Sequence, residues 1–590
     1  MKETNTKSPD YFHKVVDCQY ACPAHTPVPE YIRLIADKRY TEAYMINWES
    51  NVFPGILGRV CDRPCEPACR RGRVEDTPVA ICRLKRTAAD HRNDISNLLP
   101  GIPKEKNGKH IALIGAGPAS LTVARDLMPK GYSITIYDRD QKAGGMIRSQ
   151  IPAFRLPEKV LDEEVGYILN MGVETHFGTD ITSLKELLDK QYDAIFIGTG
   201  APSGRDLDIP GREAAGDNVQ VGINWLAGVA FEHIKTAKKK VIVLGGGNTA
   251  MDCCRTALRL GGKDVKVVVR SSFEDMKASP WEKEDAKAEG IDIINHQVPK
   301  EYVIKNGKLA GILFEKVESI YDENDRRKLV PTGEEPNLIE CDQVLVAIGQ
   351  DAKFPWIESD LGIEMDQWGM PVLNSETLQS TLPKVFFGGD AAFGPENIIT
   401  AVAHGHQAAT SIDLFCQGLP PEQRPEESYT LTSQKMGVHE WSYQNAVCNE
   451  TRQAVPHLNK RKALSSISAE VELGFDEQLA LTEASRCLSC DVQTIFSANR
   501  CIECGACEDI CPMDCINFTA NGEEVDLRSR LRVPAPLDKQ GNEQALYVSA
   551  DLKTGQIMAK DEDVCLHCGL CAERCPTGAW DMQKFQLSLT

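Results

Sequence analysis

One arrangement occurs twice in this chain: a buried strand, a glycine turn, the start of a helix and a second strand. The first copy reads K-H-I-A-L-I-G-A-G-P-A-S-L-T-V-A-R-D-L and is followed by S-I-T-I-Y-D. The second copy, about 130 residues later, reads K-K-V-I-V-L-G-G-G-N-T-A-M-D-C-C-R-T-A-L-R-L and is followed by D-V-K-V-V-V-R. A strand that is apolar throughout indicates a parallel sheet covered on both faces. The duplication therefore predicts two Rossmann-like domains within a multidomain α/β chain.

The first turn, G-A-G-P-A-S at 115–120, has the residues that a dinucleotide requires. The first glycine makes the tight turn, and the second lets the main chain approach a pyrophosphate at the helix N-terminus. Ser120 stands at the third glycine position, and Asp138 ends the following strand, where a carboxylate accepts hydrogen bonds from ribose hydroxyls. We expect a dinucleotide here; the alternative is an α/β unit that binds none.

The second turn, G-G-G-N-T-A at 245–250, suits a phosphate equally well, but its second strand leads to Arg270 rather than to an acid. An arginine at this point fits the 2′-phosphate of NADP better than a bare ribose. The alternative is a solvated surface arginine. We therefore expect a nicotinamide dinucleotide at this turn, and the choice between NAD and NADP stays open.

Three later segments extend the nucleotide-binding part. Y-D-A-I-F-I-G-T-G-A-P and C-D-Q-V-L-V-A-I-G-Q each run a buried strand into a glycine turn, where the chain can cross between nucleotide domains. F-F-G-G-D-A-A-F-G places Gly389 and Asp390 after a strand, so that the main chain there can approach a flavin. The adjacent Cys253 and Cys254 lack the C-x-x-C spacing of a redox dithiol, and we expect both in the core.

The 22 cysteines are grouped, with six in residues 18–82, eleven in 487–575 and five scattered between. The first residues, M-K-E-T-N-T-K-S-P-D-Y-F-H-K, have no apolar segment of a signal peptide, so we expect thiolate-bound metal clusters rather than disulfides. The run C-x2-C-x2-C-x3-C-P occurs at 501–512 and again at 565–576. This run is typical of a two-[4Fe-4S] ferredoxin, in which the fourth cysteine of each run ligates the other cluster. Cys515 is an additional thiol that we expect in the core.

The cysteines near the start, Cys18, Cys22 and those of C-D-R-P-C-E-P-A-C at 61–69, with Cys82 beyond, form a second group. Five or six thiols cannot fill two cubes that need four ligands each. Cys487 and Cys490, in R-C-L-S-C, are candidates for the missing ligands. A zinc site built from four of these thiols is the alternative.

Composition excludes several classes of partner. A formal net charge of −19 argues against nucleic acid or an anionic membrane, and residues 501–590 hold fifteen acidic against eight basic side chains. The chain contains no run of eighteen apolar residues, so we expect no membrane insertion and a cytoplasmic location.

Together, these motifs resemble the small (beta) subunit of glutamate synthase and its wider flavoprotein family, which includes the matching parts of dihydropyrimidine dehydrogenase and of NADH-dependent ferredoxin:NADP oxidoreductase. The resemblance spans about 15–420 and rests on G-R-V-C-D-R-P-C-E-P-A-C, G-A-G-P-A-S-L, A-G-G-M-I with I-P-A-F-R-L-P, G-G-G-N-T-A-M-D and the G-G-D near 390. The last hundred residues resemble a bacterial two-[4Fe-4S] ferredoxin. The resemblance implies FAD at the first turn, with Gly145 and Arg155 as additional contacts, a nicotinamide dinucleotide at Gly245 to Thr249, and two N-terminal [4Fe-4S] clusters.

The chain departs from the family pattern at three places. The R-C-L-x-C element that usually precedes the position of Cys18 is missing there and appears instead at 486–490, which suggests that the late copy folds back to complete the N-terminal clusters. NADP-using relatives carry two consecutive arginines where this chain has Arg270 and Ser271. The segment that usually reads E-G-R near the flavin is H-G-H at 404–406, so redox tuning there can differ.

The sequence therefore predicts specific nucleotide contacts, cluster ligands and domains. The predicted nucleotide contacts are Gly115, Gly117, Pro118, Ala119, Ser120, Asp138, Gly145, Arg155, Gly389, Asp390, Gly245, Gly246, Gly247, Asn248, Thr249 and Arg270. The predicted cluster ligands are Cys18, Cys22, Cys61, Cys65, Cys69, Cys487, Cys490, Cys501, Cys504, Cys507, Cys511, Cys565, Cys568, Cys571 and Cys575. The predicted domains are a helical iron–sulfur domain at 1–105, an FAD-binding domain at 106–220 and 341–416, an NAD(P)-binding domain at 221–340, a connecting arm at 417–490 and an α+β ferredoxin-like domain at 491–590.

The function that we predict is electron exchange between NAD(P)H and ferredoxin or a partner oxidoreductase subunit, through FAD and [4Fe-4S] clusters. Two of these clusters belong to the ferredoxin-like domain and one or two more to the N-terminal domain. The alternatives are the small subunit of a glutamate synthase, and a relay subunit without a soluble acceptor of its own. We expect no catalytic acid or base, because the cofactors carry the chemistry.

Overall fold

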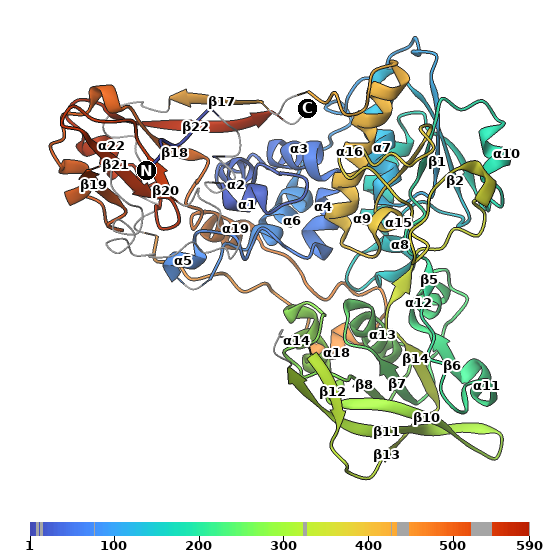
Figure 1. Cartoon of the computed structure of the whole chain (residues 1–590). Helices are drawn as coiled ribbons and strands as arrows, with labels where there is room; N and C mark the ends of the chain where they lie inside the picture. Colours follow the sequence, from blue (N-terminus) through green and yellow to red (C-terminus); the bar gives the residue numbers. More distant parts are fainter. Residues whose placement is uncertain are drawn as a thin grey trace. The chain divides into compact units, whose positions relative to one another are not determined.

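The computed structural model describes residues 1–7, 11, 16–75, 77–321, 327–425, 428–433, 448–520 and 546–588. The chain divides into two compact units, whose helices and strands are labelled in Figure 1. Unit 1 comprises Met1–Leu99, Arg424–Val455 and Gly474–Thr590, and unit 2 comprises Pro100–Gln423 and Pro456–Leu473.

Unit 2 contains two five-stranded parallel sheets that share the order of four strands and differ in one edge strand. The first sheet runs β16(Val385–Phe387), β4(Ala194–Ile197), β1(His110–Ile114), β2(Ser133–Asp138), β3(Glu174–Phe177). The second runs β6(Val219–Val221), β14(Gln343–Val346), β7(Lys240–Leu244), β8(Asp264–Val268), β9(Asp292–Ile294). β1 and β7, which lead into the two glycine turns, are the central strands, and β4 and β14 pair with them in parallel. The predicted duplication of a Rossmann-like fold is confirmed.

The helices of unit 2 cover these sheets because the strands are apolar on both faces. α7(Pro118–Leu127) and α13(Asn248–Arg259) begin directly after the two turns. The remaining helices are α8(Met146–Gln150), α9(Glu158–Leu169), α10(Leu184–Leu188), α11(Arg212–Ala215), α12(Gly222–Ala230), α14(Pro280–Glu289), α15(Asp390–Phe393), α16(Ile398–Cys416) and α18(Lys460–Ala463). An antiparallel sheet is formed by β10(Gln297–Lys305), β11(Lys308–Tyr321), β12(Arg327–Pro331) and β13(Asn337–Glu340), and β5(Ser203–Gly204) pairs with β15(Gln350–Asp351).

The N-terminal part of unit 1 is helical, as predicted. Its helices are α1(Asp17–Tyr20), α2(Val28–Ala36), α3(Tyr40–Asn51), α4(Pro54–Val60), α5(Gly72–Glu75) and α6(Ile81–His91). α19(Glu477–Ala484), from far along the chain, packs into the same core through Ala480 and Ala484. Arg486, which is fully buried, fixes the segment after α19 by donating to Glu483 at 2.7 Å and to the carbonyl oxygen of Thr77 at 2.9 Å.

The C-terminal part of unit 1 is α+β, as predicted. One three-stranded antiparallel sheet consists of β17(Ser428–Ser433), β22(Trp580–Ser588) and β18(Val492–Phe496), and another of β19(Ile516–Ala520), β21(Gln556–Asp561) and β20(Leu546–Val548). The short helices α20(Ala506–Asp509) and α22(Leu570–Arg574) each lie within one of the two cysteine runs. Cys507 and Cys571 belong to the core shared by these elements.

The segment predicted as a connecting arm at 417–490 is built into both units. Ala463 and Val471 pack on Phe154 in unit 2, whereas α19 belongs to the helical core of unit 1. Residues 426–427 and 434–447 of this segment lie outside the described residues. Within the part of the chain that the structure describes, no helix is long and apolar enough to span a membrane.

Candidate functional site

The first glycine turn is held tightly against the strand beside it. Gly115 has a φ of +96°, and a Cβ at this position would lie 2.5 Å from the carbonyl oxygen of Gly198, just after β4. A Cβ on Gly117, by contrast, would find its nearest atom 3.8 Å away. Gly115 is thus required by the fold, whereas a Cβ at Gly117 would make only an ordinary van der Waals contact, so close packing does not require a glycine there.

Other predicted contacts gather around this turn. Asp138, at the end of β2, accepts hydrogen bonds from the amides of Ala116 at 2.6 Å and Asp140 at 2.8 Å. Gly145 lies against the turn, since a Cβ there would be 2.9 Å from Cα of Gly117. A Cβ on Gly389, with φ +61°, would be 3.4 Å from Cβ of Ala119, which brings Asp390 beside the start of α7.

The polarity of this region fits a bound dinucleotide. The hydroxyls of Ser120 and Thr199 are buried and have no hydrogen-bond partner among the described residues. Burial raises the pKa of Asp390 to about 6, while the amide of Glu396 lowers it. Groups of this kind need a polar partner such as the ribityl, ribose and phosphate groups of FAD.

Arg155, which the resemblance implies as an FAD contact, forms ion pairs with two acids. Its guanidinium donates to both carboxylate oxygens of Asp252 at 2.8 Å and pairs with Glu282 at 2.6 Å. Both acids belong to the second nucleotide fold, on α13 and α14. Arg155 therefore joins the loop after α8 to the helix that follows the second turn.

The second glycine turn repeats the first. Gly245 has a φ of +136°, and a Cβ there would lie 2.1 Å from the carbonyl oxygen of Ala347, just after β14. A Cβ on Gly247 would meet no atom within 4 Å. Asn248 exchanges hydrogen bonds with Ser279, at 2.8 Å from the Ser279 amide and 3.3 Å to its hydroxyl, and so holds the loop before α14 beside the turn. Thr249 follows in the first turn of α13, and Gly246 packs on Met276.

Arg270 is exposed and follows β8 by two residues, on the same edge of the sheet as the second turn. Carboxyl ends of parallel strands share one edge, which is where such folds bind nucleotides. The position suits a 2′-phosphate. Cys253 and Cys254, in contrast, are fully buried in the core of this fold, and burial raises the pKa of both thiols, as expected for core cysteines.

Of the two histidines in H-G-H, His406 bonds Asp126 at 2.5 Å and so ties α16 to α7. Burial lowers the pKa of His404, whose ring stacks edge-on against Phe393 at 5.4 Å.

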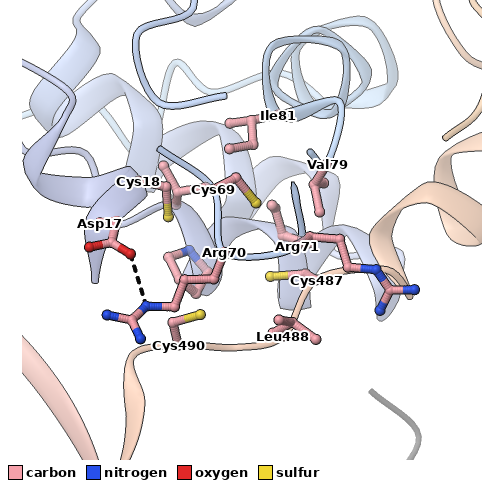
Figure 2. A pocket seen from close by; sticks show the side chains of 13 residues that line it. Asp17, Cys18, Cys69, Arg70, Arg71, Val79, Ile81, Cys487, Leu488 and Cys490 are labelled. Atoms are coloured by element: carbon pink, nitrogen blue, oxygen red, sulfur yellow. Dashed lines mark ion pairs between the residues drawn. The ribbon is translucent and has the colours of Figure 1, made fainter. Parts of the chain in front are cut away.

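In unit 1, four thiols from the two ends of the chain line one pocket. They belong to Cys18, Cys69, Cys487 and Cys490 (Figure 2). Burial raises the pKa of the Cys18 thiol, and Cys69, Cys490 and Cys487 raise it further. None of the 22 cysteines forms a disulfide. A group of closely packed thiols is therefore better explained as the binding site of a metal cluster, which thiolates ligate, than as ordinary protein packing.

Arg70 lines the same pocket. It pairs with Asp17 at 2.8 Å and donates to the carbonyl oxygen of Cys565 at 3.1 Å, so that it connects this pocket to a loop of the ferredoxin-like part (Figure 2).

The other N-terminal thiols form a second set that includes Cys82. Burial raises the pKa of Cys61, nearby Lys85 lowers it, and Cys82 and Cys22 raise it. Cys65 has Cys61 and Cys22 among its electrostatic neighbours. Cys82, with a side chain 1% exposed, was absent from the predicted ligands. Its spacing from Cys69 matches no short motif, and its deep burial among thiols becomes visible only in the fold.

The two ferredoxin-type runs are shared between two pockets. One is lined by Cys501, Cys504, Cys507 and Cys575, and the other by Cys511, Cys565, Cys568 and Cys571. The last cysteine of each run therefore lines the pocket of the other run, as the spacing predicts. Cys515 is buried, lines the second pocket and lies 3.4 Å, sulfur to sulfur, from Cys511.

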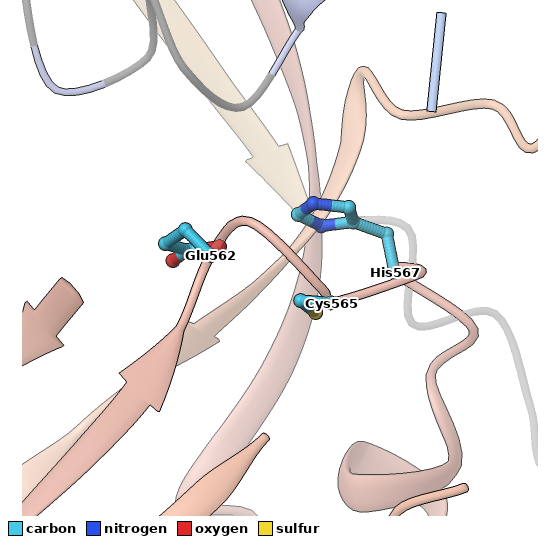
Figure 3. A group of neighbouring side chains, drawn as sticks. All are labelled: Glu562, Cys565 and His567. Atoms are coloured by element: carbon cyan, nitrogen blue, oxygen red, sulfur yellow. The ribbon is translucent and has the colours of Figure 1, made fainter. Parts of the chain in front are cut away.

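Glu562, Cys565 and His567 form a small group whose ligand atoms lie within 4.8 Å of one another (Figure 3). Because Cys565 belongs to a ferredoxin-type run, this group overlaps the second ferredoxin pocket and is no separate metal site.

Comparisons with known proteins agree with this geometry. Residues 109–405, half of the chain, match the family described as pyridine nucleotide-disulphide oxidoreductase. Residues 13–96 match domain II of dihydropyrimidine dehydrogenase with its 4Fe-4S cluster, and residues 500–579 match the 4Fe-4S dicluster domain.

Curated relatives cover most of the chain. The NADP(+)-dependent formate dehydrogenase subunit beta of Moorella thermoacetica is 34% identical over 502 residues, which are 80% of this chain and 70% of that protein. The NADPH-Fe(3+) oxidoreductase subunit beta of Geobacter sulfurreducens is 32% identical over 82% of this chain and 77% of its own length. The glutamate synthase [NADPH] small chain of Escherichia coli is 30% identical over 67% of this chain and 87% of its own length.

The duplicated nucleotide folds, the grouped thiols and these matches lead to one conclusion: the chain is an oxidoreductase that belongs to the pyridine nucleotide-disulphide oxidoreductase family, with 4Fe-4S domains on both sides of its nucleotide-binding part.

Proposed function

We propose that this chain oxidises NADPH through a bound FAD and serves as the electron-transferring subunit of a larger oxidoreductase complex. One observation carries the proposal: two glycine turns of matching geometry and four sets of four thiols occur in one chain. When bound, the flavin accepts a hydride from the nicotinamide and the iron–sulfur clusters take up single electrons.

The chain's own residues hold and orient these groups. Gly117 and the N-terminus of α7 offer amides to the pyrophosphate of FAD, Asp138 accepts from a ribose hydroxyl, and Asp390 lies beside the same turn. Gly247 and α13 offer the equivalent amides to NADPH. We assign no acid or base to the chemistry.

The ligand sets follow from which thiols lie together. Set A consists of Cys18, Cys69, Cys487 and Cys490, set B of Cys22, Cys61, Cys65 and Cys82, set C of Cys501, Cys504, Cys507 and Cys575, and set D of Cys511, Cys565, Cys568 and Cys571. Each offers the four thiolates that a [4Fe-4S] cluster requires. Set A supports the hypothesis that R-C-L-S-C at 486–490 folds back to the N-terminal thiols.

The preference for NADPH over NADH is supported by Arg270, which is exposed on the nucleotide-binding edge of the second sheet, where an acid would favour the free 2′-hydroxyl of NADH. The three relatives described above carry NADP(+) or NADPH in their names. The grouped free thiols suit a reducing compartment, and we propose the cytoplasm.

The proposed partner is another oxidoreductase subunit, since two of those relatives are named as beta subunits and one as a small chain. A ferredoxin is the alternative acceptor. The role of a glutamate synthase small chain is less well supported, because that relative aligns with 67% of this chain, whereas the formate dehydrogenase subunit aligns with 80%. Co-purification from the native source distinguishes these roles by the cofactor of the partner, FMN in a synthase and another metal or thiamine centre in a different oxidoreductase.

The test is anaerobic titration of the iron-loaded protein with NADPH and with NADH, followed by flavin absorbance and by EPR of the clusters. We expect NADPH to bleach the flavin rapidly and to produce reduced-cluster signals, and NADH to do so at much higher concentration. Failure of both nucleotides to bleach the flavin contradicts the proposal.

A further inference from the structure

Lys85, on α6, is an unusual cation for a protein interior. Its side chain is 4% exposed, and its ammonium donates to the amide oxygen of Asn51. Over the described ranges it forms no ion pair with a carboxylate. Neighbouring buried cations of the same helical part do: Arg59 pairs with Asp90 at 2.8 Å, and Arg86 with the same carboxylate at 2.9 Å.

The neighbours of Lys85 are thiols. Its electrostatic partners are the four thiols of set B, namely Cys61, Cys82, Cys22 and Cys65. A chain of hydrogen bonds also connects Lys85 to this set. The Asn51 amide group donates to the Thr26 hydroxyl, which lies 3.4 Å from the sulfur of Cys22.

An isolated buried ammonium is costly unless a negative charge compensates it. Four protonated thiols supply no such charge. Four thiolates around an iron–sulfur cube supply this negative charge, because the cluster with its ligands is a net anion. Reduction by one electron makes it more negative. A nearby fixed cation then stabilises the reduced form more than the oxidised form, and net charge is one of the factors that set cluster potentials.

We propose that Lys85 is the counter-charge of the cluster held by set B and that it raises the reduction potential of that cluster. This inference rests on the proposed function, since it takes set B to be a [4Fe-4S] site. Lys85 acts through its charge and is not a cluster ligand. Asn51 holds its ammonium beside the thiols, whose sulfur atoms are the ligands.

The test is an EPR-monitored redox titration of the full-length, iron-loaded protein. Cys65→Ser first identifies the signal of the set B cluster as the one it removes. Lys85→Met deletes the cation with little change in volume, and Asn51→Asp neutralises it in place. Lys38→Met is the matched control, because Lys38 belongs to the same helical part but its side chain is 60% exposed.

We expect Lys85→Met and Asn51→Asp to lower the midpoint potential of this one cluster by about 59 mV or more, which is a tenfold change in the ratio of oxidised to reduced cluster. Lys38→Met should leave it unchanged. An unchanged potential in Lys85→Met with full iron content overturns the inference. If Lys85→Met loads no cluster, Asn51→Asp decides: a lowered potential supports the inference and an unchanged one overturns it.

The set B cluster and the role of Lys85 are tested by different variants. If Cys65→Ser removes neither iron nor an EPR signal, set B is no cluster site and the proposed function loses one of its four sites. If Cys65→Ser removes a signal but the charge variants do not move it, the cluster stands and the role of Lys85 falls. Lys85→Arg, which keeps the charge, should retain the wild-type potential; a shift as large as that of Lys85→Met would overturn a role through charge.

Discussion

The glycines of the second turn separate a requirement of the fold from a requirement of the ligand. Gly245 has a φ of +136°, and an alanine Cβ there would lie 2.1 Å from the carbonyl oxygen of Ala347 and 2.7 Å from its carbon. Main-chain atoms of a central strand pair cannot move aside as a flexible side chain can. The backbone strain costs roughly 1–3 kcal/mol and the overlap another 1–3 kcal/mol, so Gly245→Ala should destabilise this fold by about 2–6 kcal/mol.

Gly247→Ala is the matched variant. Its Cβ would meet no protein atom within 4 Å, and φ at Gly247 is −98°, which alanine adopts freely. We expect at most about 1 kcal/mol of destabilisation, because alanine is a poorer N-cap than glycine. The new methyl group, however, points into the space proposed for the pyrophosphate of NADPH. We therefore expect an affinity for NADPH that is lower by about tenfold or more, or at least 1.4 kcal/mol.

Hydrogen–deuterium exchange of peptides covering β7 and β14 measures the first effect, in the absence of nucleotide, and calorimetric titration with NADPH measures the second. Gly245→Ala should speed exchange in these strands by about 30-fold or more, the equivalent of 2 kcal/mol. The reasoning is refuted if Gly245→Ala exchanges like the wild type. It is equally refuted if Gly247→Ala binds NADPH with unchanged affinity, because the ligand then does not use this turn.

Four further predictions test the remaining sites. Replacing Cys487 and Cys490 together by serine should remove about four iron atoms per chain and one EPR signal, whereas Cys416→Ser, outside every thiol set, should remove none. Cys82→Ser should likewise cost one cluster if Cys82 completes set B, and Cys515→Ser should retain full iron content because set D already supplies four ligands. Arg270→Ala should weaken NADPH binding by about tenfold or more, because it removes a charge-assisted contact worth about 1.5–3 kcal/mol. It should leave NADH binding unchanged. Equal loss of affinity for both nucleotides would place the 2′-phosphate elsewhere. Burial raises the pKa of Asp390 to about 6, above its unfolded value near 3.9. In the flavin-free protein, the stability of the wild type relative to Asp390→Asn should therefore fall as pH rises from about 4 through 6. Urea unfolding at several pH values can detect or exclude this trend.

Patterns that are local in the sequence predicted the architecture well. The two strand–turn–helix copies and the strands that lead into Gly198 and Ala347 are each encoded in one short continuous segment, and all appear in the predicted type of sheet. The two cysteine runs predicted the ferredoxin-like part for the same reason, since their spacing fixes a known way of wrapping two clusters.

Long-range contacts are what the sequence could not supply. The ion pairs of Arg155 with Asp252 and Glu282 had no local signature, because both acids lie on helices of the other nucleotide fold, far from residue 155 in the sequence. Cys82 stands alone in the sequence and joins set B only because α6 returns beside α4, where its thiol donates to the carbonyl oxygen of Leu57 at 3.1 Å. The segment at 456–473 packs on Phe154 through Ala463, Val471 and the partly buried Leu458, and this packing has no local signature in the sequence.

Set A has a consequence for how the protein is made. Cys18 and Cys69 leave the ribosome early, but Cys487 and Cys490 emerge only after the entire nucleotide-binding part has been synthesised. During that interval the N-terminal helices lack α19 and two of the four proposed ligands of set A, so iron loading at the proposed site would wait for the late segment. On this proposal the cellular iron–sulfur assembly machinery would act at set A only after residue 490 has been made, and any chain that stops before residue 487 would lack Cys487 and Cys490.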